Sequence, residues 1–225
     1  MKFYVKHKDI AVPGQLLAEG MDVLPSSGTF RKGDKVLACK YGLVEIRDRV
    51  IKVIPLSGVY IPNKGDMIIG KVTEVGFAGW LVDIGSPYSA NLPIGEAVKE
   101  KVDLLTVDIS KFFDIGDLIF AKVLNVTKSK IIQLSMKENG RKLIGGRIVK
   151  ITPTKVPRVI GKKGSMINLL KEKSGCNILV GQNGWIWIKG KPEAEFKVTH
   201  ALYMIEKESH ISGLTDKIKK FLEGA

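Results

Sequence analysis

Residues 159–167 read VIGKKGSMI and form the most informative stretch of this 225-residue chain. Gly161 and Gly164 let another backbone approach closely, because neither carries a Cβ atom. Apolar residues follow at helical spacing, so a helix is expected to begin directly after the second glycine. Amide groups at the start of a helix face anions, and Lys162 and Lys163 add positive charge. The stretch therefore predicts a loop that holds phosphate groups.

The elements around this loop follow a definite order. A strand is expected over residues 142–151 before the loop, and the helix after the loop should end at Gly175, a common C-terminal signal. Strands are then expected over residues 176–180 and 185–189, followed by a helix opened by Pro192. A final amphipathic stretch adds one or two helical turns at residues 214–222. The order is strand, short helix, loop, helix, two strands and helix.

This order, together with the Gly-x-x-Gly loop, resembles a type I KH domain. The resemblance implies an apolar groove beside the loop that holds about four unstacked nucleotides of single-stranded RNA. A plain glycine-rich turn is the alternative. The residues that the resemblance places at the RNA are Arg158, Ile160, Gly161, Lys162, Lys163, Gly164 and Ser165.

The middle of the chain predicts a small β-barrel. Strands are expected over residues 67–75, 80–84, 90–92, 118–126 and 131–135. The connection over residues 97–113 is longer and more charged, and is expected to be helical or irregular. Five short strands with a long third connection suit an OB-type barrel.

This barrel segment resembles the S1 RNA-binding domain, since residues 76–82 read GFAGWLV at the first turn. The resemblance places Phe77 and Trp80 where S1 domains present aromatic rings, on which bases stack irrespective of sequence. Lys71 and Lys122 are expected to line the same surface. The alternative for both aromatic residues is that they plug a barrel end or a domain interface.

Part of the usual S1 site is altered. Pro93 stands where S1 domains often carry a histidine, and Thr127 and Lys130 stand where they often carry aspartate and arginine. Lys128 and Lys130, between the fourth and fifth expected strands, are candidate RNA ligands, with a solvated hairpin tip as the alternative.

Residues 1–62 are expected to form a compact β domain without a binding motif. Strands over residues 35–40, 43–47 and 50–54 predict a small antiparallel meander. Turns are expected at residues 12–15 and 25–28. This domain is therefore expected to have a structural role and no binding site of its own.

Charge indicates a polyanionic partner. The chain carries 36 basic and 23 acidic residues, a formal net charge of +13 and a pI of about 9.6. Residues 138–225 hold 17 basic and 8 acidic residues, whereas residues 63–137 hold 9 of each. Because neutralising phosphates releases condensed counterions, nucleic acid is the favoured partner.

Catalytic and metal chemistry find no support in the sequence. Cys39 and Cys176 lie too far apart for a zinc ribbon and are expected to be buried free thiols in a reducing cytosol. His7, His200 and His210 are scattered, without a nucleophile or metal-ligand spacing. No catalytic residue, metal or cofactor is expected. The absence of an apolar leader or membrane-length stretch predicts a soluble cytoplasmic protein.

Trp185 and Trp187 alternate with Ile186 and Ile188, so both indoles are expected on the face of the sheet opposite the helices. Packing between domains is the expected reason, with a partner subunit or RNA as alternatives.

The whole chain is thus expected to be multidomain, mainly β with an α+β part. The predicted units are an N-terminal β domain at residues 1–62, an S1 barrel at 63–137 and a KH domain with a C-terminal helix at 138–225. This order resembles the S1- and KH-containing RNA-binding cap subunits of the archaeal exosome. Supporting strings are VPG at residues 12–14, GVYIP at 58–62 and GDMIIGKV at 65–72.

The resemblance implies a subunit that is not an enzyme. Three copies would sit on a hexameric ring of RNase PH-like subunits, docked by the N-terminal domain. Single-stranded RNA would be captured and its 3′ end guided into the ring for 3′-to-5′ degradation or tailing. The alternatives are a free-standing S1/KH regulator or RNA chaperone, and a nuclease in its own right.

Overall fold

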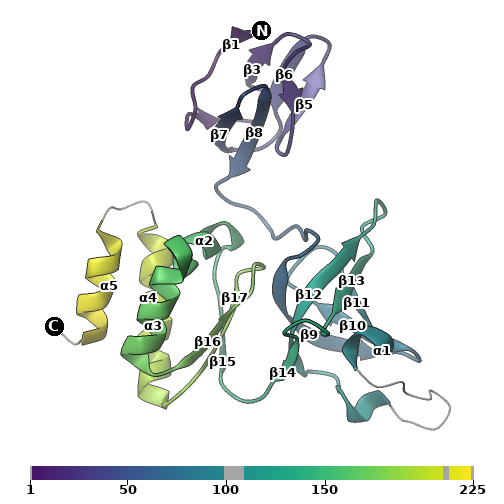
Figure 1. Ribbon diagram of the computed structural model, residues 1–225, viewed down its shortest axis with the longest axis vertical. Helices are drawn as coiled ribbons and strands as arrows, with labels where there is room; N and C mark the ends of the chain where they lie inside the picture. Colours follow the sequence, from purple (N-terminus) through teal and green to yellow (C-terminus); the bar gives the residue numbers. More distant parts are fainter. Residues whose placement is uncertain (1, 99–108, 210–212, 224–225) are drawn as a thin grey trace. The chain divides into compact units, whose positions relative to one another are not determined.

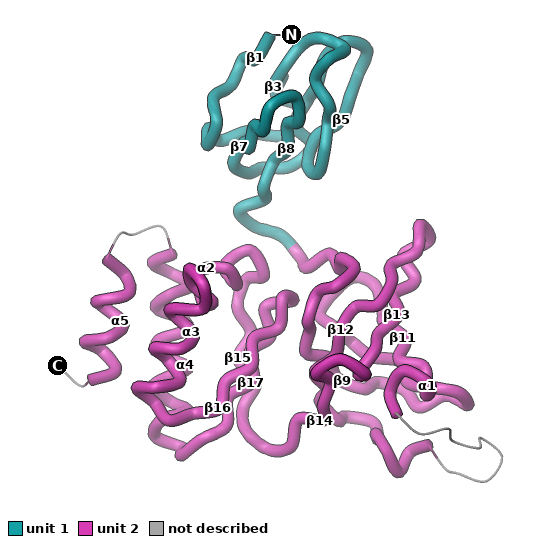
Figure 2. Tube along the Cα trace, in the orientation of Figure 1, with its two compact units in different colours: residues 1–58 teal, residues 59–225 magenta. Residues whose placement is uncertain are grey.

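The computed structural model describes residues 2–98, 109–209 and 213–223. The chain divides into two compact units, Met1–Gly58 and Val59–Ala225 (Figure 2). The first consists of strands only, and the second combines a barrel with a helix-covered sheet (Figure 1). The expected class, mainly β with an α+β part, is confirmed.

The first unit contains two four-stranded sheets. One sheet has the order β1 (Lys2–Phe3), β3 (Leu16–Glu19), β6 (Lys35–Ala38) and β5 (Thr29–Lys32). The other has the order β2 (Ile10–Ala11), β7 (Gly42–Arg47), β8 (Val50–Pro55) and β4 (Leu24–Pro25). Their inner faces share one core, which includes Leu17, Val36, Val44 and Ile51.

The predicted meander over residues 35–54 is wrong. β7 and β8 do form an antiparallel hairpin, but β6 pairs with β3 and β5 in the other sheet. These partner strands directly follow the two predicted turns, and the sequence analysis predicted no strand for either of them. The chain thus changes sheets after β6, which lets both sheets cover the same small core.

The barrel of the second unit contains the five expected strands. They are β9 (Met67–Val75), β10 (Gly79–Asp83), β11 (Ala90–Pro93), β12 (Leu118–Val126) and β13 (Ile132–Ser135). The strand order β13-β11-β10-β9-β12 closes because β13 also pairs with β12. Of the long connection, α1 (Ile94–Ala97) and a 3₁₀ turn (Ile109–Lys111) are described, and residues 99–108 lie outside the described residues.

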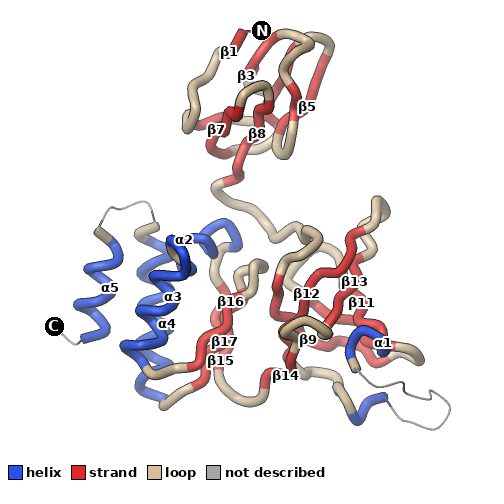
Figure 3. Tube along the Cα trace, in the orientation of Figure 1, coloured by secondary structure: helices blue, strands red, loops and turns tan. Residues whose placement is uncertain are grey.

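The remaining residues form a three-stranded sheet with helices on one face (Figure 3). Its order is β15-β17-β16, with β15 (Arg147–Lys150), β16 (Asn177–Val180) and β17 (Trp185–Lys189). The helices are α2 (Val156–Ile160), α3 (Ser165–Ser174), α4 (Pro192–Lys207) and α5 (Leu214–Glu223). A 3₁₀ turn at Pro153–Lys155 precedes α2, and one at Lys162–Gly164 precedes α3. The expected order of elements is confirmed.

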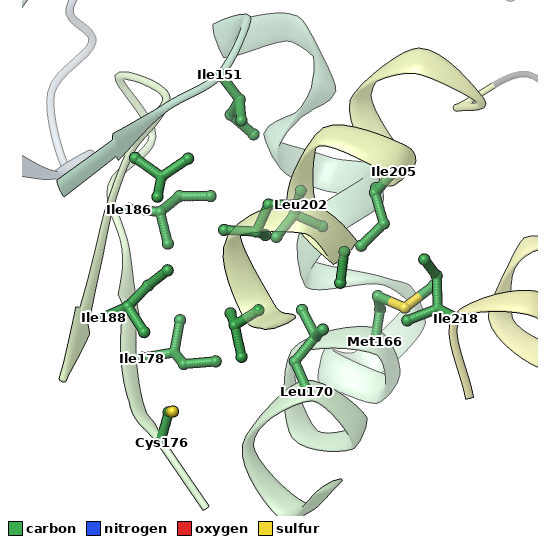
Figure 4. Close-up of a cluster of buried hydrophobic side chains, with 14 of the residues drawn as sticks. Ile151, Met166, Leu170, Cys176, Ile178, Ile186, Ile188, Leu202, Ile205 and Ile218 are labelled. Carbon is green, nitrogen blue, oxygen red and sulfur yellow. The ribbon is translucent and has the colours of Figure 1, made fainter. Parts of the chain in front are cut away.

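The apolar faces of these helices and this sheet meet in one core. Leu170, Ile178, Ile188 and Leu202 come from α3, β16, β17 and α4 and are at most 1% exposed. Figure 4 shows their side chains converging between the sheet and the helices. Ile218 of α5 joins the same core, so the C-terminal helix is an integral layer of the fold.

The single strand expected over residues 142–151 is in fact two strands. β14 (Arg141–Leu143) pairs with β12 in the barrel sheet, whereas β15 pairs with β17. Gly145 and Gly146 separate them, with φ angles of 68° and 76° that only glycine adopts readily. The glycine pair thus carries the chain from one sheet to the next.

The barrel packs against the sheet through the two tryptophans. Trp185 and Trp187 are 6% and 5% exposed and cluster with Ile69 and Phe120 of the barrel and Leu143 of β14. The prediction that both indoles serve packing between domains is confirmed.

Candidate nucleic-acid interface

The loop of residues 161–164, called the GxxG loop below, joins α2 to α3 by a backbone path that requires glycine. Gly161 has φ 75°, and a Cβ atom there would lie 2.7 Å from the amide nitrogen of Met166. Gly164 has φ 80°, but an added Cβ would meet nothing closer than 3.7 Å. Gly161 is therefore required by space and conformation, and Gly164 by conformation alone.

The structure brings the predicted KH residues together. They occupy the end of α2, the GxxG loop and the first residue of α3. Arg158, Lys162, Lys163 and Ser165 are exposed, while Ile160, Gly161 and Gly164 are half-buried. No aspartate or glutamate occurs between residues 153 and 171. The loop therefore presents cations at its surface, as an RNA backbone requires.

Sequence reasoning missed a neighbour of this loop. Gly213, Leu214 and Thr215, at the start of α5, line a pocket together with residues of the GxxG loop. The amphipathic pattern of residues 214–222 predicted a helix, but gave no indication of where that helix packs.

The placement of Trp80 corrects the predicted S1 site. Its side chain is fully buried, its Nε1 donates a 2.8 Å hydrogen bond to the carbonyl oxygen of Phe113, and the two rings pack edge to face at 5.1 Å. A buried indole offers no face on which a base can stack. Its alternation with Val82 and Ile84 was the signal, because these three residues share the inner face of the barrel wall.

Phe77 differs sharply from Trp80, because it is 75% exposed in the turn between β9 and β10. Lys128 and Lys130 are exposed in the turn between β12 and β13. β9 and β12 are antiparallel, with Lys71 opposite Leu118 and Met67 opposite Lys122. This register places the two turns at opposite ends of the β9–β12 ladder, so the structure does not unite Phe77 with Lys128 and Lys130.

Lys71 and Lys122 share the outer face of the barrel wall with each other, but not with Trp80, which lies on the inner face, so the expected common surface is not formed. The centre of their outer face is also covered. Their strands present Ile69 and Phe120 between them, and Trp185 and Trp187 pack there. Lys122 lies 2.5 Å from the carboxylate of Glu138. The two lysines therefore flank an interface within the second unit.

Two carboxylates stabilise the barrel. Ser135 and then Lys137 hydrogen-bond to Glu96 and lower its pKa. Burial alone would raise the pKa of Asp117, but hydrogen bonds from Lys142 and from the amide of Asp114 outweigh it and lower that pKa. Both groups are thus held as anions by structural partners.

Other chemistry is sparse in the described part of the chain. No three His, Cys, Asp or Glu side chains of residues 2–98, 109–209 and 213–223 could together hold a metal ion. Cys176 is buried as expected, whereas Cys39, which directly follows β6, is exposed. Within these ranges, each helix is too short or too polar to cross a membrane.

Three family models match successive parts of the chain. The N-terminal domain of the exosome RNA binding protein RRP4 matches residues 8–57, the RRP4 S1 domain matches residues 59–125, and the KH domain matches residues 146–194.

Whole-length relatives agree with these matches. The exosome complex component Rrp4 of Pyrococcus abyssi is 51% identical, over 98% of this chain and 84% of its own. The Rrp4 of Methanothermus fervidus is 50% identical over 97% of each chain. A crystal structure described as an exosome complex RNA-binding protein is 37% identical, with a TM-score of 0.69 over 74% of this chain and 97% of that one. The chain therefore belongs to the Rrp4 family of exosome RNA-binding proteins.

Proposed function

We propose that this chain is a cap that captures single-stranded RNA and guides its 3′ end into a phosphorolytic ring of RNase PH-like subunits in the cytoplasm. The observation that carries the proposal is the GxxG loop, whose glycine-dependent backbone presents Lys162 and Lys163 to solvent. Three caps on a hexameric ring would feed RNA to it for 3′-to-5′ degradation or tailing. The cap itself is not an enzyme, and the ring performs the chemistry.

RNA contacts divide between the two RNA-binding modules of the second unit. The GxxG loop and its neighbours Arg158, Ile160 and Ser165 grip the backbone, since cations and glycine-lined backbone suit phosphates. Phe77 supplies one exposed ring for base stacking. The near-neutral barrel then passes RNA onward, whereas the basic KH module gathers it.

The N-terminal unit supports a docking role through one sheet face. Ile10 pairs with Leu43, and Leu43 pairs with Ile54, so three apolar side chains form a row across β2, β7 and β8. Ile10 and Ile54 are 56% and 45% exposed. An exposed apolar row on a sheet suits a protein partner, and a ring subunit is the partner that exosome membership provides.

The domain limits 62/63 and 137/138 stay a proposal from the sequence, and β14, which follows the second limit, still pairs with β12 of the barrel. The KH-like order of elements begins with β15, after β14 has completed the barrel sheet.

Native mass spectrometry of the complex purified from its source tests the proposal. Three copies of this chain with six ring subunits are expected. Recovery of the chain without RNase PH-like partners would favour the free-standing regulator instead. Incubation of the pure chain with labelled RNA, with and without phosphate or magnesium, should give no shortened products, and shortening would indicate a nuclease.

A further inference from the structure

A pocket of about 330 Å³ lies beside the GxxG loop. Residues from α2, from the loop and from the first turn of α5 line it, although the chain separates the first and last of them by more than 50 positions. The lining residues are Arg158, Gly161, Lys162, Ser165, Met166, Gly213, Leu214 and Thr215.

The wall formed by α5 is fixed in place. Leu214, Ile218 and Leu222 are 2%, 0% and 8% exposed and belong to the KH core. Figure 4 shows the side chain of Ile218 beside that of Met166, which also lines the pocket. Lys217 further binds Glu208 of the chain segment after α4, at 2.7 Å. The start of α5 is thus held next to the loop by packing.

The polar lining of the pocket matches a phosphate group. Arg158 and Lys162 are cations, and Ser165 and Thr215 carry hydroxyl donors. Among the residues that the structure describes, no carboxylate side chain lines the pocket, although Asp216 follows Thr215 directly in the chain. A volume of this size accommodates a small polar group with part of a sugar.

We propose that this pocket binds a second backbone phosphate of the RNA, beyond the phosphates on the GxxG loop itself, and that α5 is therefore part of the RNA site. The proposal rests on the proposed function, because the pocket shares Gly161, Lys162 and Ser165 with the KH loop. An RNA backbone held on the loop can continue directly into the pocket, which favours RNA over a free phosphate ion.

The variant Thr215→Glu tests the pocket without removing the α5 core residues. Thr215 is exposed, and an acidic residue in the first turn of a helix is stabilising, so the fold should be kept. Lys219→Gln is the matched control, since it also lowers the net charge by one, at an exposed position of α5 that does not line the pocket. Affinity for single-stranded RNA is measured by filter binding on the full chain.

Thr215→Glu is expected to weaken RNA binding by roughly three- to tenfold, the effect of one repulsive charge at a partly screened site. Lys219→Gln should bind almost as the parent does. Equal losses in both variants, or none in Thr215→Glu, would overturn the inference. The inference would also be overturned if Thr215→Glu changed the binding of inorganic phosphate, measured by NMR, but left the affinity for RNA unchanged.

A third variant separates this inference from the proposed function. Gly164→Asp alters the loop and not the α5 wall. Weak binding by Gly164→Asp with parent-like binding by Thr215→Glu would overturn the pocket alone. Parent-like binding by both would overturn the KH site as well.

Discussion

The side-chain Nδ2 of Asn183 donates a 2.7 Å hydrogen bond to the carbonyl oxygen of Ile69, and a 2.8 Å bond to that of Ile84. Its Oδ1 accepts a 3.3 Å hydrogen bond from the amide of Ile69. Asn183 is 2% exposed, in the turn between β16 and β17. The hairpin turn of the KH sheet is therefore bound into the barrel wall.

Asn183→Ala should lower the free energy of unfolding by about 2–4 kcal/mol, because it leaves buried backbone groups of the barrel without a partner. Chemical denaturation measures this change. Gln182→Ala is the control, since its side chain is exposed and only its backbone amide bonds to the barrel, at the carbonyl of Met67. The control should change stability by no more than about 0.5 kcal/mol. Equal stability of both variants would show that the Asn183 bonds are not needed.

Phe77→Ala should weaken RNA binding, whereas Trp80→Ala should lower the stability of the fold. Removing the exposed ring of Phe77 should weaken binding of single-stranded RNA by about 1–3 kcal/mol, the value of one stacked base, with the Tm unchanged. Removing the buried indole of Trp80 should cost about 3–5 kcal/mol of stability through cavity formation. Filter binding and thermal unfolding measured on each variant check the contrast. An RNA defect confined to Trp80→Ala, with an intact Tm, would contradict the assignment.

Acid should destabilise the barrel through Glu96 and Asp117. Their pKa values are lowered in the folded state, so their contribution is complete above the ordinary values of about 4.3 and 3.9. It is lost as the pH falls through the lower, folded values. Each group is partly exposed and should contribute no more than about 1 kcal/mol.

Unfolding free energies measured between pH 7 and pH 3 test this pH dependence. The double variant Glu96→Gln with Asp117→Asn should show a flatter dependence than the parent. Parallel curves for the parent and the variant would contradict it.

Ile54→Asp should weaken association with the ring by about tenfold or more, because it places a charge at the β8 end of the apolar row that crosses β2, β7 and β8. Phe30→Asp is the matched control, since Phe30 is 44% exposed on β5 of the other sheet of the same unit. Surface plasmon resonance with immobilised ring compares the two variants. A larger loss of ring association in Phe30→Asp than in Ile54→Asp would show that the docking face lies on the other sheet.

The sequence predicted those strands, helix ends and loops whose signals lie within the element itself. Alternation and turn residues defined residues 67–75 and 118–126 as strands, and Gly175 ended α3 as a left-handed cap with φ 64°. The GxxG loop was predictable because its backbone conformation demands glycine at fixed positions.

Long-range partners were not predictable in the same way. The division of β6 and β7 between two sheets depends on pairing with upstream strands, which no local signal shows. Asn183 looks like any turn residue, because its partners lie 99 and 114 positions away. Trp80 was assigned to the surface by resemblance, although its alternation with apolar neighbours indicated the core.

The most direct test of RNA capture by the GxxG loop is the affinity of Gly164→Asp for single-stranded RNA, measured together with ring assembly. Gly175→Asp is the matched control: Gly175 has φ 64° and no neighbour within 4 Å of an added Cβ, so the same charge and a similar backbone strain arise away from the loop. Gly164→Asp should bind RNA about tenfold more weakly or worse, because its carboxylate faces the phosphates, while ring assembly stays intact. Unchanged RNA affinity in Gly164→Asp, or an equal loss in Gly175→Asp, would contradict capture by this loop.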